Sequence, residues 1–314
     1  PLLRRLKRCK TILIRCEMKL RAHNRYDYVP LPDRQDYTWP EGKRLAFCLC
    51  NNLEVFSYRE GIGSDSAVLN APQTHRNYAW RDYGNRVGQW YLFDLLDDFS
   101  IPASHNSNSA LFRRHPQLLD RIKLRGDEIV AHGRSNGERQ DVLDEPNERE
   151  LIQEATEELI ELIGYQPKGW MGPYFAQSEV TLDLLQEAGY CFNLDWPADD
   201  QPFWMRTRNG RIMSVPYSIE LNDSPSMVFR QESAMSFERM IKDQFDEMMY
   251  LSQKRPLVFT LITHPFVFGH PYRLRALRRA LTHIMERRDE LWITTVGGVY
   301  DYCAGLEKGI VPGS

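Results

Sequence analysis

Short apolar runs alternate with amphipathic helical segments along most of the chain, and this alternation is the strongest constraint on its fold. Runs typical of buried strands lie at residues 44–50, 100–103, 128–131, 168–171, 190–194, 257–263 and 291–295. Segments with helical spacing lie between them, for example at 111–124, 147–163 and 233–252. This order predicts parallel strands covered by helices, in a doubly wound or barrel-like domain. Because the composition does not shift along the chain, we expect one domain over residues 44–314.

Two segments interrupt the alternation. Residues 203–207 and 211–215 flank Asn209-Gly210, a pair typical of tight hairpin turns, and this predicts a short inserted hairpin. Residues 56–83 are polar and aromatic, with glycine and proline as breakers. A loop of this length is typical of a lid or a binding loop.

The N-terminal region has a different character. Residues 18–43 are rich in Tyr, Pro, Asp and Arg and have no helical or strand periodicity, so we expect an arm lying over the domain surface. Residues 1–17 are basic and begin on Pro1. We expect them to be a non-native or disordered extension, with Met18 as the natural start.

Charge and cysteine content limit the classes of partner. The net charge is −3, which gives no reason to expect a nucleic acid or an anionic membrane as partner. The six cysteines have no paired spacing, which is typical of reduced thiols in a cytoplasmic protein. We therefore expect a cytoplasmic protein that binds a small-molecule substrate and that can form a homo-oligomer.

Polar side chains follow several of the predicted strands. Asn52 and Glu54 follow the first strand, while His132, Asp195 and His264 follow later ones. In a parallel barrel the carboxyl ends of all strands open on one face, so residues far apart in sequence can converge there. Carboxylates with two histidines suit hydrolysis, which needs a base to activate water, an acid for the leaving group and a group that orients the acid.

The order of these motifs resembles the polysaccharide deacetylase superfamily, and within it the allantoinase-like branch, which hydrolyses cyclic amides or ureides. The matching segments are Asn52-Leu53-Glu54, residues 81–88, His132-Gly133, Gly169-Trp170, residues 199–204, residues 215–217, Asn222-Asp223, His264-Pro265 and residues 269–271. They span roughly residues 25–300. The resemblance implies an α/β fold, a distorted parallel (β/α) barrel with fewer than eight complete units.

The positions that bind metal in this superfamily depart from its pattern. Metal-dependent members carry two adjacent aspartates after the first strand and an HxxxH motif after the third. Here these positions are Glu54-Val55 and His132 with Asn136. Because a catalytic zinc needs about three protein ligands, we expect no catalytic metal and no cofactor. The alternative is a zinc ion held by His132, Glu54 and an unidentified third ligand.

The resemblance also implies roles for the strand-end residues. Glu54 is expected to be the general base, with a pKa raised by burial; the alternative is a salt bridge to an arginine among residues 81–86. His132 is expected to donate a hydrogen bond to the carbonyl oxygen, or else to be structural. His264 is expected to be the general acid, with Asp195 fixing its tautomer.

Several other side chains are candidates for substrate binding. These are Asn52, Trp170, Tyr174, Trp204 and Tyr217. For the aromatic residues, packing in the core is the alternative. The residues expected to form turns rather than a site are Asp199, Asp200, Asn222 and Asp223. The arginine that the family places before the Pro-Tyr pair is absent at Gly172-Pro173-Tyr174, so the group that polarises the carbonyl is left open.

We therefore predict a hydrolase of a non-peptide carbon–nitrogen bond, in an amide, cyclic imide or ureide, that lacks the usual metal. Glu54 acts as base and His264 as acid. One alternative is a metal-dependent N-deacetylase acting on acetylated sugars, which chelator sensitivity would reveal. Another is a catalytically inactive barrel that binds a small molecule or a partner.

Overall fold

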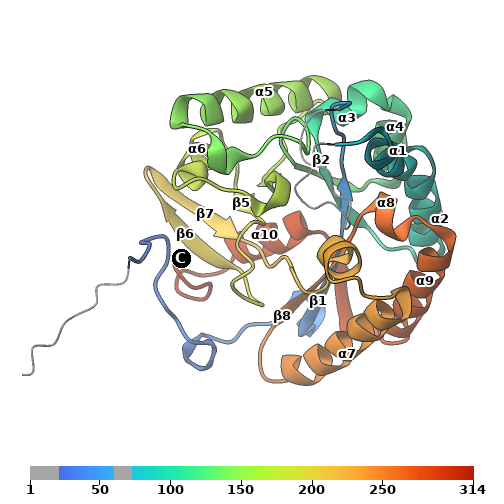
Figure 1. Cartoon of the computed structure of the whole chain (residues 1–314). Coiled ribbons are helices and arrows are strands. Elements are labelled where there is room, and N and C mark those ends of the chain that lie inside the picture. The colour runs from blue at the N-terminus through green and yellow to red at the C-terminus, as the bar shows by residue number, and fades with distance from the viewer. Residues whose placement is uncertain (1–20, 60–72) are drawn as a thin grey trace, which may run out of the picture.

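Parallel strands form the centre of the molecule, as the alternation predicts. The computed structural model describes residues 21–59 and 73–314 (Figure 1). The strands are β1 Leu45–Leu53, β2 Ala103–Ser107, β3 Glu128–Ala131, β4 Gly169–Trp170, β5 Phe192–Asn193, β6 Phe203–Thr207, β7 Gly210–Ser214, β8 Leu257–Thr263 and β9 Leu291–Thr294. They pair in the order β6-β7-β5-β4-β3-β2-β1-β8, and β9 pairs with β1. This is the predicted distorted (β/α) barrel, with β6 at one end of the strand path and β8 at the other.

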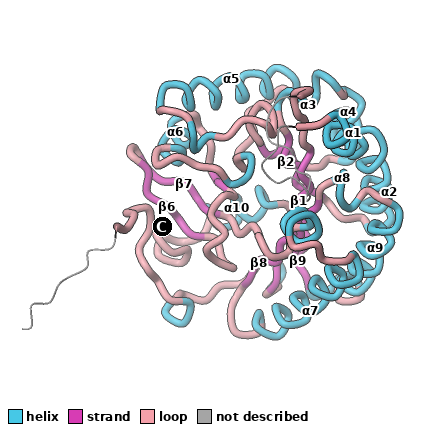
Figure 2. The backbone as a smooth tube through the Cα atoms, viewed as in Figure 1, coloured by secondary structure: helices cyan, strands magenta, loops and turns pink. Residues whose placement is uncertain are grey.

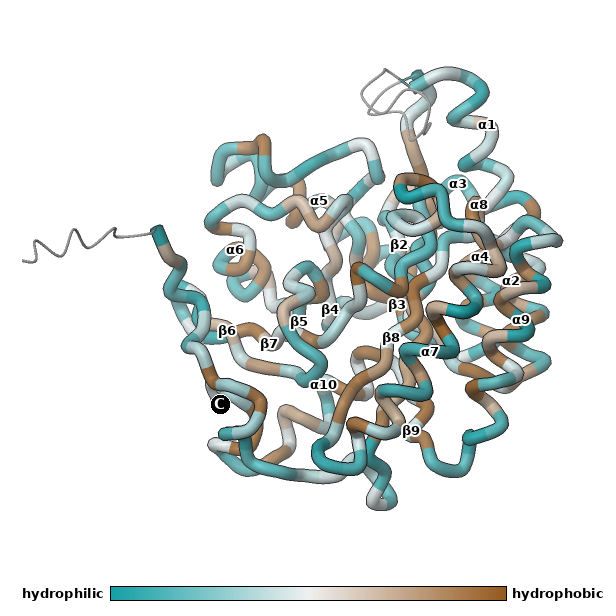
Figure 3. Tube along the Cα trace, turned by 60° about the horizontal axis from the view of Figure 1, so that its bottom comes forward, coloured by the Kyte–Doolittle hydropathy of each residue, from teal (hydrophilic) through white to brown (hydrophobic). Residues whose placement is uncertain are grey.

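Helices cover the outside of the strands (Figure 2). They are α1 His75–Tyr83, α2 Gln89–Phe99, α3 Ser109–Arg114, α4 Pro116–Arg125, α5 Glu145–Ile163, α6 Thr181–Glu187, α7 Ala234–Ser252, α8 Pro265–Phe268, α9 Pro271–Met285 and α10 Val296–Ala304. The hydropathy colouring places apolar segments at the strands and polar ones on the outer turns (Figure 3). The buried residues of the long helices α5, α7 and α9 are mostly apolar, which is how an amphipathic helix removes apolar surface from water.

The structure corrects three predicted elements. The helix expected at 111–124 is two helices, because Pro116 begins α4 and cannot donate a backbone hydrogen bond to the preceding turn. The strand expected at 100–103 lies later, at 103–107, because Ser100 is the left-handed cap of α2. Residues 75–83 form α1 rather than loop.

Helix α1 begins where Thr74 accepts a hydrogen bond from the Asn77 backbone N–H, 3.1 Å away. This is the usual way in which a threonine caps a helix N-terminus. Of the loop predicted at 56–83, residues 60–72 lie outside the described residues.

The predicted hairpin is confirmed, and it forms the outer edge of the sheet. Strands β6 and β7 are antiparallel, whereas the other strand pairs are parallel. Two segments cover the free side of β6. The backbone N–H of Arg206 donates to the Arg25 carbonyl oxygen at 2.6 Å, and that of Trp204 donates to the Pro312 carbonyl oxygen at 2.8 Å.

The described part of the predicted N-terminal arm, residues 21–43, lies along the domain surface (Figure 1). Its Arg34 pairs with Asp199 at 2.6 Å, and Trp39 is fully buried with its indole N–H donating to the Leu257 carbonyl oxygen. The extension predicted at residues 1–17 lies outside the described residues. The division into extension, arm and domain stays a prediction.

Within residues 21–59 and 73–314, no helix is both long and apolar enough to cross a bilayer. The cysteines of this part of the chain are free thiols, namely Cys48, Cys50, Cys191 and Cys303.

A close backbone contact joins two segments that flank the sheet. A π-helix at Gly84–Gly88 connects α1 to α2 and packs against α8, the helix that follows His264. A Cβ atom on Gly88 would lie 2.2 Å from the Pro265 carbonyl oxygen, and one on Gly84 would lie 2.6 Å from the Phe266 nitrogen. Only glycine permits this approach, so the segment around residues 81–88 is fixed relative to His264.

Candidate active site

Three of the predicted catalytic side chains converge at the carboxyl ends of the strands. Glu54 follows β1, His132 follows β3 and His264 follows β8. Oε1 of Glu54 lies 3.3 Å from Nε2 of His264 and 4.0 Å from Nε2 of His132. All three side chains are buried: Glu54 is 8% exposed, His264 is 7% exposed and His132 is 1% exposed. The predicted convergence of Glu54 with the two histidines is therefore observed.

The backbone after β1 is held by asparagines of three other segments. The Asn85 side chain donates to the Glu54 carbonyl oxygen at 2.8 Å. The Asn136 backbone N–H donates to the Val55 carbonyl oxygen, also at 2.8 Å. The Asn108 side-chain oxygen accepts from the Val55 N–H at 2.8 Å. Because its carbonyl and the next peptide unit are bonded, Glu54 cannot shift without breaking these contacts.

The charge state of Glu54 differs from the prediction. Burial raises the pKa of this carboxyl group, but the charges of His264, His132 and Arg81, with a hydrogen bond from His264, lower it by more. The net shift is downward, whereas we expected burial to raise the pKa. Glu54 is therefore ionised at neutral pH, as a base that accepts a proton must be.

His264 is held in its charged form. Its Nδ1 lies 2.6 Å from Oδ1 of Asp223, and its backbone N–H donates to Oδ2 of the same residue at 2.8 Å. Burial lowers the pKa of His264, but the negative charges of Asp223 and Glu54 raise it to about 10. At neutral pH the ring carries both protons, and Nε2 points its proton towards Glu54.

The predicted pairing of Asp195 with His264 is wrong, because the carboxylate that contacts the His264 ring belongs to Asp223. Asp223 was expected only to form a turn. It lies beside β8 because its neighbour Asn222 bridges to Ile262, two residues before His264. Asp195 follows β5, and its carboxylate bonds to Gly172, Gln177 and Asn193 rather than to His264.

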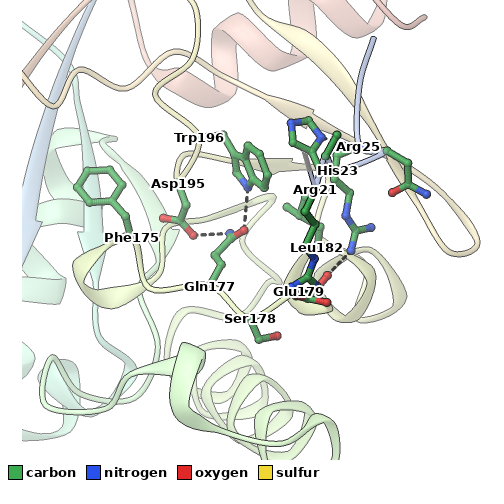
Figure 4. A pocket seen from close by; sticks show the side chains of 12 residues that line it. Arg21, His23, Arg25, Phe175, Gln177, Ser178, Glu179, Leu182, Asp195 and Trp196 are labelled. Atoms are coloured by element: carbon green, nitrogen blue, oxygen red, sulfur yellow. Dashed lines mark hydrogen bonds and ion pairs between the residues drawn. The ribbon is translucent and has the colours of Figure 1, made fainter. Parts of the chain in front are cut away.

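Asp195 instead belongs to a separate pocket of about 770 Å³ that the arm residues 21–25 also line (Figure 4). Its carboxylate accepts from the Gly172 N–H at 2.8 Å and from the Gln177 amide at 2.6 Å. Burial raises the pKa of Asp195 to about 7, because the hydrogen bonds from neutral donors do not outweigh the loss of water. The geometry thus gives Asp195 a role in holding the turn after β4.

The ring of His132 is oriented by the backbone of the next strand. Its Nδ1 lies 2.5 Å from the Met171 carbonyl oxygen, which can only accept, so Nδ1 carries the proton. Burial lowers the pKa of His132 and keeps the ring neutral. Nε2 then presents a lone pair, and it has no hydrogen-bond partner among the described residues. The expected donation from His132 to a carbonyl oxygen needs a proton that Nε2 does not carry.

Two of the predicted substrate-binding residues lie beside His264. The side-chain amide nitrogen of Asn52 lies 3.0 Å from Nε2 of His264 and 2.8 Å from the hydroxyl oxygen of Tyr217. Tyr174 is 37% exposed, and its hydroxyl raises the pKa of Arg81, which burial lowers by more. Asn52 and Tyr217 therefore lie beside the acid side of the cluster, and the role of all three side chains in substrate binding stays a prediction.

The two tryptophans predicted to bind substrate, Trp170 and Trp204, pack away from Glu54, in line with the alternative of a packing role. Trp170 is fully buried, and its indole N–H donates to the Gln140 side chain at 3.1 Å. Trp204 lies on the edge strand β6, under the Arg211 guanidinium at 4.1 Å from the ring centroid. Neither ring lies in the space around Glu54.

Comparison with known proteins supports the resemblance. A family model for polysaccharide deacetylase matches residues 79–192. The peptidoglycan deacetylase of Helicobacter pylori (strain ATCC 700392 / 26695) is 23% identical over 248 residues, covering 68% of this chain and 82% of the relative. The chain is thus similar to the polysaccharide deacetylase superfamily in sequence. It is an enzyme of the amidohydrolase class, which acts on carbon–nitrogen bonds.

Solved structures agree with this fold. A "probable Polysaccharide deacetylase" from Pseudomonas aeruginosa PAO1 superposes with a TM-score of 0.76 at 24% identity, over 84% of this chain and 92% of that one. Puue allantoinase superposes with a TM-score of 0.75 at 25% identity, over 85% and 93% of the two chains. The polysaccharide deacetylase barrel is thus shared over nearly all of the described residues.

The expectation that no cofactor is needed is wrong on this comparison, because the polysaccharide deacetylase family is typically metal-dependent. His132 has the form of a metal ligand, with one ring nitrogen anchored on a carbonyl and a lone pair on the other. The other usual ligand positions hold Val55 and Asn136. No group of three His, Cys, Asp or Glu in the described ranges could hold a metal ion. The residues therefore do not fit the family's three-ligand site.

Sequence reasoning did not assign a functional role to two residues of the site. Asp223 was identified only as part of a matching Asn-Asp pair. Arg81 was only one of the arginines offered as an alternative partner for Glu54. It is 3% exposed, and the charge of Glu54 and the hydroxyl of Tyr174 both act on it. The match of residues 81–88 to the allantoinase-like branch was the signal that could have singled it out.

Proposed function

We propose that this enzyme hydrolyses a non-peptide carbon–nitrogen bond in an amide, cyclic imide or ureide, with Glu54 as general base and His264 as general acid. One observation carries this proposal. An ionised carboxylate lies 3.3 Å from a histidine that a second carboxylate, Asp223, keeps protonated. A charged base beside a charged acid is what the addition of water and the departure of nitrogen require.

The steps follow from these charge states. With substrate bound against both side chains, Glu54 takes a proton from water while the water oxygen bonds to the carbonyl carbon. His264 then gives its Nε2 proton to the nitrogen as the carbon–nitrogen bond breaks. Asp223 keeps the Nδ1 proton in place and stabilises the ring charge before this transfer. The products are an amine or amide nitrogen group and a carboxylic acid.

The likeness to an allantoinase supports a cyclic ureide as the first substrate to test. The likeness to a peptidoglycan deacetylase supports N-acetylated sugars as the second. A panel of allantoin, hydantoin, succinimide and N-acetylglucosamine oligomers distinguishes the classes. We expect the enzyme to turn over the cyclic ureides and imides of this panel.

Exchange of the base provides the test of the mechanism. Glu54→Gln keeps the shape but cannot accept the proton, so kcat should fall roughly 10²–10⁴-fold on the substrate that the wild type turns over. Glu161→Gln is the matched control, since that carboxylate is 65% exposed on the outside of the barrel. Metal content is measured and matched in all proteins. Full activity of Glu54→Gln would overturn the proposal.

The orientation of His132 favours a second candidate, a metal-dependent N-deacetylase acting on acetylated sugars. A histidine with a buried, unpartnered Nε2 supports it. The test is to remove metal by chelation, reload with Zn²⁺ or Co²⁺ and assay N-acetylglucosamine oligomers. Activity that requires the metal and is lost in His132→Ala would favour this candidate over the first.

A further inference from the structure

A buried arginine lies in the active site although no strand carries it. Arg81 is on α1, yet it is 3% exposed and its guanidinium carbon lies 3.6 Å from the centroid of the Phe56 ring. Phe56 is two residues after Glu54. The contact therefore fixes the guanidinium relative to the base and covers one face of its plane, while the N–H donors point outward in that plane.

The segment that carries Arg81 also holds the base. Asn85, one helical turn further, donates to the Glu54 carbonyl oxygen at 2.8 Å. The glycine contacts of Gly84 and Gly88 fix the same segment against the helix that follows His264. Arg81 is thus placed by both the base side and the acid side of the site.

Tyr174 is the second residue near Arg81, since its hydroxyl raises the pKa of the guanidinium, which burial lowers by more. It has a backbone φ of +61°, followed by Phe175 at +56°. Consecutive non-glycine residues in this region are strained, and such strain persists where the surroundings hold it, often at functional sites. The strained turn thus carries the tyrosine whose hydroxyl acts on the guanidinium.

Attack by water places negative charge on the carbonyl oxygen, and this charge needs a donor. His132 directs its Nδ1 proton to the Met171 carbonyl oxygen and so away from the substrate. Arg81 is a permanent cation within electrostatic reach of Glu54. We propose that Arg81, aided by Tyr174, binds the carbonyl oxygen of the substrate and stabilises the negative charge that develops on it.

This inference rests on the proposed function, and it predicts a specific pattern of kinetic loss. Arg81→Met should lower kcat roughly 10²–10³-fold with little change in KM, because the interaction strengthens in the transition state. Arg81→Lys should retain part of the activity, and added guanidinium should partly restore Arg81→Ala. Arg86→Met is the control, since Arg86 is 72% exposed on the same segment. A purely structural role would lower the melting temperature without rescue by guanidinium.

Binding supplies a readout that needs no turnover. Allantoate and acetate are the carboxylate products of the ureide and acetyl arms, and calorimetry on the full chain should show at least tenfold weaker binding of one of them to Arg81→Met. An Arg81→Met variant with the kcat and the product affinity of the wild type would overturn the inference. Losses of kcat and product affinity that are explained by a lower melting temperature alone would also overturn it. If Glu54→Gln is inactive while Arg81→Met is fully active, this inference fails and the proposed function stands. If Glu54→Gln is fully active, the proposed function itself fails.

Discussion

Two partly buried glutamates at opposite ends of the parallel strands have opposite charge behaviour. Glu54 follows the carboxyl end of β1, where positive charges lower its pKa. Glu128 begins β3 at the other end and accepts from the Ser104 hydroxyl at 2.7 Å and from the Gly297 N–H at 3.1 Å. Burial raises the pKa of Glu128, since these donors are neutral.

The difference shows that burial alone does not assign a role to a carboxylate. At one end the neighbours are charged, and one of them can exchange a proton with the carboxylate. At the other end the neighbours are a hydroxyl and the Gly297 N–H in the first turn of α10, which the carboxylate anchors. Charge should therefore matter for activity at the Glu54 end, whereas hydrogen bonding should matter for stability at the Glu128 end.

The largest expected effect is on His264. In Asp223→Asn the negative charge that raises the pKa of His264 is lost, so this pKa should fall. The basic limb of the kcat/KM profile should move to lower pH, and kcat at pH 8 should fall roughly 10²-fold. Asp195→Asn is the control, and its basic limb should stay in place because Asp195 does not contact His264. An unmoved basic limb in Asp223→Asn would remove His264 as the acid.

At the other end of the strands, Glu128→Ala should unfold more easily. It leaves the Ser104 hydroxyl and the Gly297 N–H without their acceptor, which should lower the free energy of unfolding by about 2–4 kcal/mol. Glu128→Gln keeps an acceptor oxygen and should cost less than about 1 kcal/mol. Urea titration measures both values. Each folded variant should keep wild-type kcat, and a tenfold loss in Glu128→Gln would break the comparison.

A methyl group at Gly297 should have a smaller effect. A Cβ atom there would lie 1.9 Å from Oε1 of Glu128, so the carboxylate must move away from the helix N-terminus. We expect Gly297→Ala to lower the free energy of unfolding by about 1–3 kcal/mol. The control is Gly305→Ala, whose Cβ atom would have its nearest neighbour at 3.5 Å. Equal stabilities of the two variants would contradict the anchoring role of Glu128.

The smallest effect is on the pH dependence of stability. Because the folded-state pKa of Glu128 is raised, its contribution to stability is complete below the ordinary carboxyl pKa and is lost as pH rises through the raised value. Glu128→Gln removes this loss. The melting temperature of the variant minus that of the wild type should therefore be more positive at pH 8 than at pH 5. A difference that falls with pH would mean that the pKa of Glu128 is lowered instead.

Sequence reasoning found the strand ends but not which strands are neighbours. Glu54, His132 and His264 were predicted because each follows an apolar run, and parallel strands bring such residues to one face. Asp195 and Asp223 also follow such runs or turns, and only the strand order decides which one meets His264. An aspartate at the end of a strand is not enough to identify a partner.

The sequence also did not show in which direction some side chains point or where one helix lies, and both were needed to predict the site. Trp170 is on a strand of two residues, too short for alternation to show whether its ring faces the core or the mouth. Arg81 lies on a helix that was predicted as loop, so its position depended on tertiary contacts with Phe56 and α8. The fold class, by contrast, followed from the local pattern of apolar residues.

The covering of β6 has a consequence for handling the protein. The N–H groups of Arg206 and Trp204 are bonded to residues 25 and 312, from opposite ends of the described chain. A sheet edge that loses such cover can pair with another molecule, which is a common route to aggregation. Trimming residues 21–30 or 311–314 to obtain a shorter form should therefore reduce solubility while leaving the catalytic side chains in place.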